Sequence, residues 1–175
     1  IKNKKNIIIK PNFVSDSRQP ASSHVDSAEA VIEFLTKELN IEEKRIIIAE
    51  SSAGNTKKAY ENFNFVKLKQ KYNIKLIDLN HKQSKKITLT YQNNKQINIR
   101  VSEILLNKNN FIISLAKLKT HDNVIATLSL KNLLMGSIIK KDIIRNDKQK
   151  MHKGIKNINM LLYKLSKHGV AISSL

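Results

Sequence analysis

A chain of 175 residues, 41% of them hydrophobic, can bury the core of one domain, and it has no apolar run of about 18 residues that would cross a membrane. The absence of cysteine excludes disulfides, thiolate zinc sites and iron–sulfur clusters held by this chain. The formal net charge of +18 is typical of nucleic-acid-binding proteins, but lysine, isoleucine and asparagine are abundant together and the lysines are spread along the chain. Since the codons of an A/T-rich genome produce the same composition, we rank nucleic acid below a small ligand.

The first half of the chain alternates short apolar runs with amphipathic segments. Ser23 and Asp26 offer a hydroxyl and a carboxylate at the spacing that caps a helix, and apolar residues recur at helical spacing from Val25 to Leu39. This pattern predicts strands at 6–9, 45–50 and 74–79, and helices that start near Ser23, run from the turn at 51–55 to about Asn64, and span 66–72.

The second half begins with a different pattern. Residues 86–101 alternate with period two around Asn93 and Asn94, which tolerate left-handed turn geometry, so we predict a β-hairpin. The remaining elements expected are a short helix at 102–107, a strand at 110–115, a stretch at 125–135 that can be helical, a charged connection at 140–154, a last helix at 155–167 and a strand that begins at Val170.

Short apolar strands that alternate with helices predict an α/β domain with a mainly parallel sheet, flanked by helices, and a β-hairpin insertion near 86–101. We expect one domain over residues 1–175. The chain starts just before one expected strand and ends as another begins, so we expect a fragment of a longer chain. No basic-then-apolar signal segment precedes the first expected strand, so we expect a cytoplasmic protein without membrane contact.

Polar side chains follow the expected strands, and open parallel sheets bind ligands beyond the carboxyl ends of their strands. Lysine provides a point charge there, while asparagine and threonine provide directional hydrogen bonds, so we expect a phosphate or carboxylate ligand. The residues at these ends are Lys10, Asn12, Glu50, Ser51, Ser52, Asp78, Asn80, Lys117, Lys119, Thr120 and His121. Helix N-termini near Ser23 and Ser52 would add backbone N–H groups.

The catalytic candidates are His121, Lys117 and Glu50. His121 could act as an acid, a base or a ligand, because the unperturbed pKa of a histidine lies near neutrality, while Glu50 could orient it or hold a cation. We expect Lys10, Lys117 and His121 to open into one cleft, with Lys117 and Lys119 on the same face of a continued strand. The alternative is that these lysines are surface charge in a lysine-rich chain.

The known short functional motifs identify no specific metal, cofactor or catalytic site in this sequence. His24, His121 and His152 could join Glu50 around a metal, but no pair has HxxxH or HExxH spacing, so the metal stays unknown. The sequence lacks GxGxxG, GxxxxGK[ST] and GxSxG, so we expect no Rossmann cofactor site, P-loop or hydrolase nucleophile.

Five segments (7–15, 21–35, 46–52, 74–80 and 115–136) resemble, in order, the family called domain of unknown function 362. Relatives often have proline where this chain has Val25 and Ala116, which alters backbone rigidity rather than chemistry. Many relatives carry a ferredoxin-like module with four-iron–four-sulfur clusters, so the resemblance implies a redox association. With no cysteine here, any cluster would lie in a missing segment or a partner. The resemblance implies site residues at Lys10, Asn12, His24, Glu50, Lys117, Lys119, Thr120, His121, Lys131, Asn132 and His152.

The function we expect is the binding or transformation of a small anionic ligand, bearing phosphate or carboxylate, at the carboxyl edge of the sheet. The ligand-binding candidates are Lys10, Asn12, His24, Ser51, Lys119, Thr120, Lys131, Asn132 and His152. A solvated helix explains Lys131 and Asn132 equally well. The alternatives are a basic nucleic-acid-binding module and a docking surface for a ferredoxin-type partner, and the sequence does not decide whether the protein is an enzyme.

Overall fold

A computed structural model describes residues 1–90, 94–121, 124–127, 129–142, 144–152, 163, 166 and 167, without the side chains of 119–121, 124–127 and 152. The expected strand from Val170 and the turn residue Asn93 lie outside the described residues, as does nearly all of the expected helix at 155–167.

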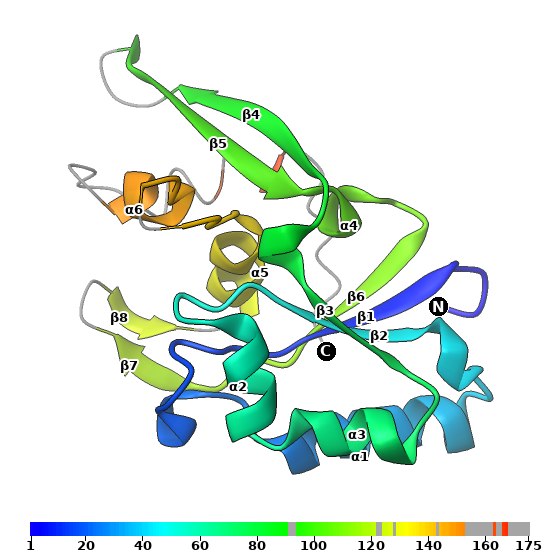
Figure 1. Ribbon diagram of the computed structural model, residues 1–175. Helices are drawn as coiled ribbons and strands as arrows, with labels where there is room; N and C mark the ends of the chain where they lie inside the picture. The colour runs from blue at the N-terminus through cyan, green and yellow to red at the C-terminus, as the bar shows by residue number, and fades with distance from the viewer. Residues whose placement is uncertain are drawn as a thin grey trace.

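The core of the described chain is a parallel sheet. Its four strands, β1 (Asn6–Lys10), β2 (Ile46–Glu50), β3 (Lys75–Asp78) and β6 (Asn110–Ser114), lie in the order β3-β2-β1-β6, and each neighbouring pair is parallel (Figure 1). Ile8 of β1 lies between Ile47 and Ile112. The isoleucine runs form strands because a branched side chain packs well on a sheet that is covered on both faces. The predicted α/β fold with a mainly parallel sheet is therefore confirmed.

Helices cover both faces of this sheet (Figure 1). On one face, Ile7, Ile9 and their neighbours pack against α1 (Val25–Glu33), which continues as a π-type turn over Phe34–Glu38, and against α2 (Thr56–Asn62) and α3 (Phe65–Lys71). On the other face, Ile8 and its neighbours pack against α4 (Glu103–Leu106) and α5 (Ser129–Ser137). Adjacent isoleucines of one strand thus serve opposite layers of the core.

The predicted hairpin is confirmed. Strands β4 (Ser84–Thr90) and β5 (Gln96–Ser102) pair in antiparallel fashion and form a sheet of their own among the described residues. Their apolar face packs against α5 and against Met151 of α6 (Asp147–His152). Asn94 has a φ of 57°, the left-handed conformation that asparagine tolerates in a turn.

Three sequence expectations need correction. Helix α1 is capped by His24, whose Nδ1 accepts from the backbone N–H of Asp26, whereas Ser23 Oγ accepts from Asn12 N and donates to the carbonyl of Leu115. Residues 125–135 are not one helix: β7 (Lys119–His121) pairs with β8 (Val124–Thr127) before α5 begins. The segment 140–154, expected to be a connection, contains the helix α6, which is too rich in charged residues to show the apolar spacing that predicts a helix.

The described chain also has three short 3₁₀ turns, at Gln19–Ala21, Glu43–Arg45 and Leu79–His81. None of the described helices has the length and apolar character needed to cross a membrane.

Candidate functional site

The site is built around Lys10, the last residue of β1, whose side chain is fully buried. Its Nζ donates to both carboxylate oxygens of Glu50 at 2.9 Å, to the carbonyl of Pro11 at 3.0 Å and to Oδ1 of Asn132 at 3.2 Å. An ammonium group has three N–H donors, and these acceptors occupy all of them. Lys10 therefore organises the site from within rather than offering a free charge to a ligand.

Glu50, at the end of β2, is 2% exposed. Besides Lys10, its carboxylate accepts from the backbone N–H of Ser51 at 2.7 Å and from that of Phe13 at 3.3 Å. Removing two charges from water is costly, and the cost is offset only where the pair is close and its remaining polar atoms are satisfied. The Lys10–Glu50 pair meets that condition and has no net charge.

Asn132 ties helix α5 to this pair. Its Nδ2 donates to the carbonyl of Lys10 at 3.2 Å and to Ser114 Oγ at 3.1 Å, while its Oδ1 also accepts from Asn12 Nδ2 at 3.2 Å. One turn further along α5, a Cβ atom on Gly136 would collide with Cε and Nζ of Lys10. Glycine is needed there because the lysine side chain passes directly against the helix backbone.

A cavity of about 360 Å³ opens over this network, at the carboxyl edge of the sheet. Three further lysines, Lys131, Lys140 and Lys148, line it together with the amides of Asn12, Asn146 and Gln149. Among the described lining residues, the acidic one is Glu50, which Lys10 neutralises. The cavity is therefore cationic.

The amine of Lys148, on α6, is strongly perturbed by its surroundings. Its Nζ contacts the carbonyl oxygen of Ser51 and lies 2.9 Å from Ser51 Oγ. Desolvation lowers the pKa of Lys148 from 10.5 to about 7. The positive charges of Lys10 and Lys140 lower this pKa further, and the negative charges of Glu50 and Asp78 oppose the shift.

The hairpin holds α6 in place through Asp147. One carboxylate oxygen of Asp147 accepts from the backbone N–H and from Nε of Arg100, both at 2.8 Å, and the other lies 2.7 Å from Lys150 Nζ. Burial raises the pKa of Asp147, but the hydrogen bonds from Arg100 and Lys150 outweigh it, so the carboxyl titrates below its ordinary range. Asp147 thus stays charged and fixes its neighbour Lys148 at the cavity.

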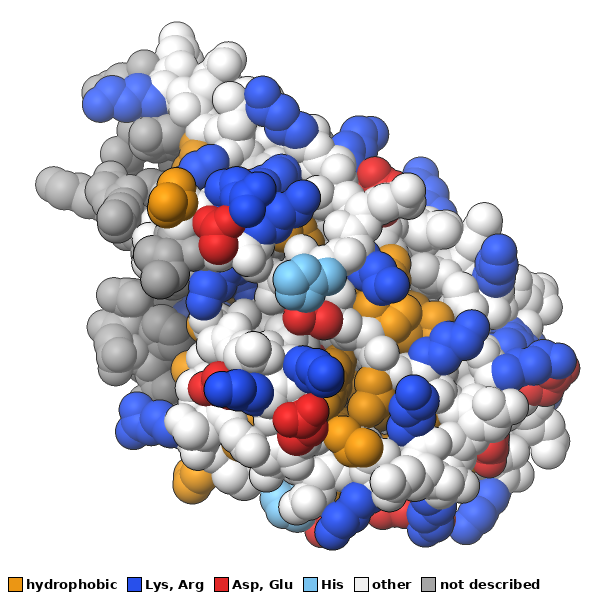
Figure 2. Space-filling view, in the orientation of Figure 1, with side chains coloured by type: hydrophobic (Ala, Val, Ile, Leu, Met, Phe, Trp, Pro, Cys, Tyr) orange, Lys and Arg blue, Asp and Glu red, His pale blue; other side chains and the backbone are white. Residues whose placement is uncertain are grey.

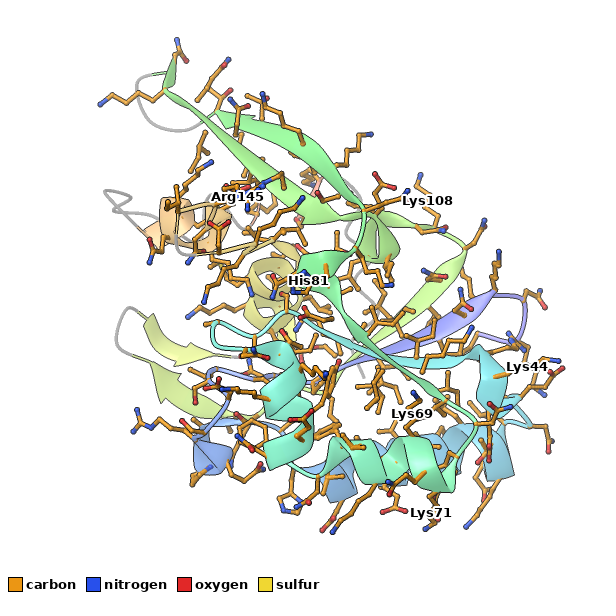
Figure 3. The ribbon with its side chains drawn as sticks, in the orientation of Figure 1. Lys44, Lys69, Lys71, His81, Lys108 and Arg145 are labelled. Carbon is orange, nitrogen blue, oxygen red and sulfur yellow. The ribbon has the colours of Figure 1, made fainter. Side chains whose placement is uncertain are left out.

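A larger cavity of about 830 Å³ shares Lys140 with this one. It is lined by residues of α2 and α3 and by His81, which is labelled in Figure 3. Carboxylates and lysines both line it, namely Glu61, Asp78, Asp142, Lys57, Lys69 and Lys141. The mixed charges favour an anion less than the smaller cavity does.

The structure brings together six of the residues expected from the sequence around the smaller cavity: Lys10, Asn12, Glu50, Ser51, Lys131 and Asn132. Lys117 is exposed in the loop after β6 and is not among the described residues that line the cavity. His24 caps α1 and lines a different cavity, beside Gln19 and Asp26.

Four expected residues can be placed only by their backbone. Lys119, Thr120 and His121 form β7, and His152 ends α6. Since β7 follows β6, it lies beyond the same sheet edge as the end of β1 (Figure 1). Lys10 therefore lines this cavity and Lys117 does not, while the position of the His121 side chain stays a prediction.

Sequence reasoning missed Gly136, Lys140 and Lys148. Glycine is rare in this chain, and a glycine within an apolar helical segment often indicates that another part of the chain approaches the helix backbone closely. The sequence pattern could therefore have indicated Gly136. Lys140 and Lys148 stand in a run of charged residues, which gave no such signal. In the described part of the chain, no group of three or more histidine, aspartate or glutamate residues is arranged to hold a metal ion.

These features define an α/β domain with a cationic cavity, floored by a buried lysine–glutamate pair, at the carboxyl edge of a parallel sheet. The model of the family described as Domain of unknown function (DUF362) matches residues 7–172, and the chain belongs to this family. No curated protein and no solved structure matches the chain.

Proposed function

We propose that the protein binds a small anion, bearing a phosphate or a carboxylate, in the cavity beside Lys10. The observation that carries the proposal is the charge of the cavity lining. Lys131, Lys140 and Lys148 line a space whose acidic residue, Glu50, is neutralised from within by Lys10. A volume of about 360 Å³ lies in the lower part of the range for small-molecule sites.

The surroundings of these lysines favour an anion over a neutral ligand. The amides of Asn12, Asn146 and Gln149 also line the cavity and can donate directional hydrogen bonds to oxygen atoms. The cavity wall is partly apolar, with Phe13 and Met135, which weakens the screening of charge by water. A phosphate or carboxylate would meet point charges and N–H donors together.

The nucleic-acid alternative predicts a concentrated basic surface. Figure 2 shows lysine and arginine distributed over the visible face, with acidic side chains among them. In Figure 3 the labelled Lys44, Lys71 and Lys108 lie at separate edges of the molecule. This scatter favours the small ligand. A redox role and a ferredoxin-type partner rest on the family resemblance alone.

Isothermal titration calorimetry with inorganic phosphate and with acetate tests the proposal. We expect saturable binding at one site, weakened about tenfold or more by Lys140→Met, since hydrogen bonds to charged groups contribute about 1.5–3 kcal/mol. Lys108→Met is the matched control, because it removes the same charge from the exposed surface near β6. The proposal fails if both variants weaken binding equally, or if a DNA duplex binds tightly at physiological salt while neither anion binds.

A further inference from the structure

The hydrogen bonds of Ser51 fix the role of the Lys148 amine. Ser51 Oγ lies 2.7 Å from the carbonyl oxygen of Gly136, which can only accept, so the single hydroxyl proton is donated there. The contact between Ser51 Oγ and Lys148 Nζ must then use a proton of the amine. A second proton of the amine is donated to the carbonyl of Ser51. Both N–H groups of a neutral Lys148 are thereby occupied, and its lone pair is left free.

We propose that Lys148 forms a Schiff base with a small carbonyl compound that carries a carboxylate or phosphate. The inference rests on the proposed function and names the substrate class of the same cavity. Lys148 and Ser51 both line the cavity, so the amine lies where the anion would bind. Lys131 and Lys140, which line the same space, would hold the anionic end of the ligand and leave the carbonyl carbon to Lys148.

The charge state of the amine agrees with this geometry. The groups that act on it come from four elements: Lys10 from β1, Glu50 from β2, Asp78 from β3 and Lys140 from the segment before α6. With a pKa of about 7, roughly half of the Lys148 amine is neutral at neutral pH, whereas an ordinary lysine is neutral in about one molecule per few thousand. Neutral amine is the reactive form in imine formation.

The bonds of the proposed step balance without an oxidant or a reductant. The Nζ lone pair forms a bond to the carbonyl carbon, and the electron pair of the C–O double bond moves to oxygen. One proton from the amine and one from a hydronium ion of the solvent convert that oxygen into a water molecule, which leaves as the C–N double bond forms. The protonated imine keeps one N–H group, which can still donate to Ser51.

Reductive trapping tests the inference. The whole chain is incubated with pyruvate and cyanoborohydride, digested and mapped by mass spectrometry, with Lys148→Arg as the variant and Lys108→Arg as the matched control. We expect a single dominant adduct at Lys148, absent from Lys148→Arg, unchanged in Lys108→Arg and suppressed by inorganic phosphate. The initial trapping rate at Lys148 should rise as the pH increases toward about 7, because deprotonation produces the nucleophile.

The outcomes separate this inference from the proposed function. Adducts spread over many lysines according to exposure, or undiminished total labelling in Lys148→Arg, would overturn the inference. Phosphate binding by calorimetry without trapping at Lys148 would overturn the inference and leave the proposed function standing. If neutral acetone and pyruvate are trapped equally at Lys148, and phosphate does not reduce the trapping, the anionic substrate class and the proposed function are both overturned. Circular dichroism of each variant checks that it is folded.

Discussion

Lys10→Met removes the cation from the centre of the site while keeping much of the side-chain volume. Glu50 would then keep the backbone donors of Ser51 and Phe13 but lose both contacts at 2.9 Å to the lysine. The substitution leaves the buried carboxylate of Glu50 without its cation, and breaking a buried ion pair in this way destabilises a protein by about 3–5 kcal/mol. The substitution also removes a donor from the carbonyl of Pro11.

Equilibrium unfolding in urea measures this loss. With a slope of about 2 kcal/mol per molar urea, a loss of 3–5 kcal/mol lowers the midpoint by about 1.5–2.5 M. The double variant Lys10→Met/Glu50→Gln should be more stable than Lys10→Met, since it removes the uncompensated charge as well.

The control is Lys108→Met, an exposed lysine whose loss should change the free energy of unfolding by about 0.5 kcal/mol or less. A loss below about 1 kcal/mol for Lys10→Met would refute the reasoning. Equal stability of Lys10→Met and Lys10→Met/Glu50→Gln would refute it too, because the uncompensated carboxylate would then carry no cost.

Two further predictions concern the helices that frame the cavity. Gly136→Ala should lower the free energy of unfolding by about 1–3 kcal/mol in a urea titration, because the new Cβ collides with Lys10. In an ordinary helix the same substitution raises the free energy of unfolding, so an increase here would contradict the prediction. Asp147→Asn should cost about 1–3 kcal/mol near neutral pH, since it weakens the contacts with Arg100. The pKa of Asp147 is lowered from 3.8 in the folded protein, so the stabilisation from its carboxylate is present above about pH 4 and is lost as the pH falls further. The difference in unfolding free energy between Asp147→Asn and wild type should therefore shrink below about pH 4. A difference that stays constant with pH would contradict this prediction.

The fold was largely predictable because its strongest signals are local. The isoleucine runs in β1 and β2 and the alternation of 86–101 are short patterns that a sheet requires, and all appear where expected. The start of α1 was misplaced because two serine hydroxyls and a histidine all stand near it, and a tertiary contact decided among them. Ser23 is drawn into hydrogen bonds with Asn12 and Leu115, which leaves the cap to His24.

A position at a strand end predicted Lys10 and Glu50, whereas Lys131 and Asn132 of α5 were implied by the family resemblance. Lys10 and Glu50 come together because neighbouring parallel strands end at the same edge. Lys117 also follows a strand, but it lies three residues beyond the end of β6, in a loop that leaves it exposed. A sequence pattern also does not reveal that Lys10 is buried and donates to four acceptor atoms, two of them on Glu50.

The contacts of the hairpin with α6 explain why sequence patterns did not predict Lys148 as a site residue. Arg100 of β5 binds Asp147 through both its backbone N–H and its side chain, and Met151 packs into the apolar face of the same hairpin. These contacts place α6 over the end of the parallel sheet, where Lys148 reaches Ser51. The amine is therefore positioned by a segment that looks in the sequence like an unrelated insertion. Changes in the hairpin should therefore alter the cavity, because the hairpin holds the helix that carries Lys148.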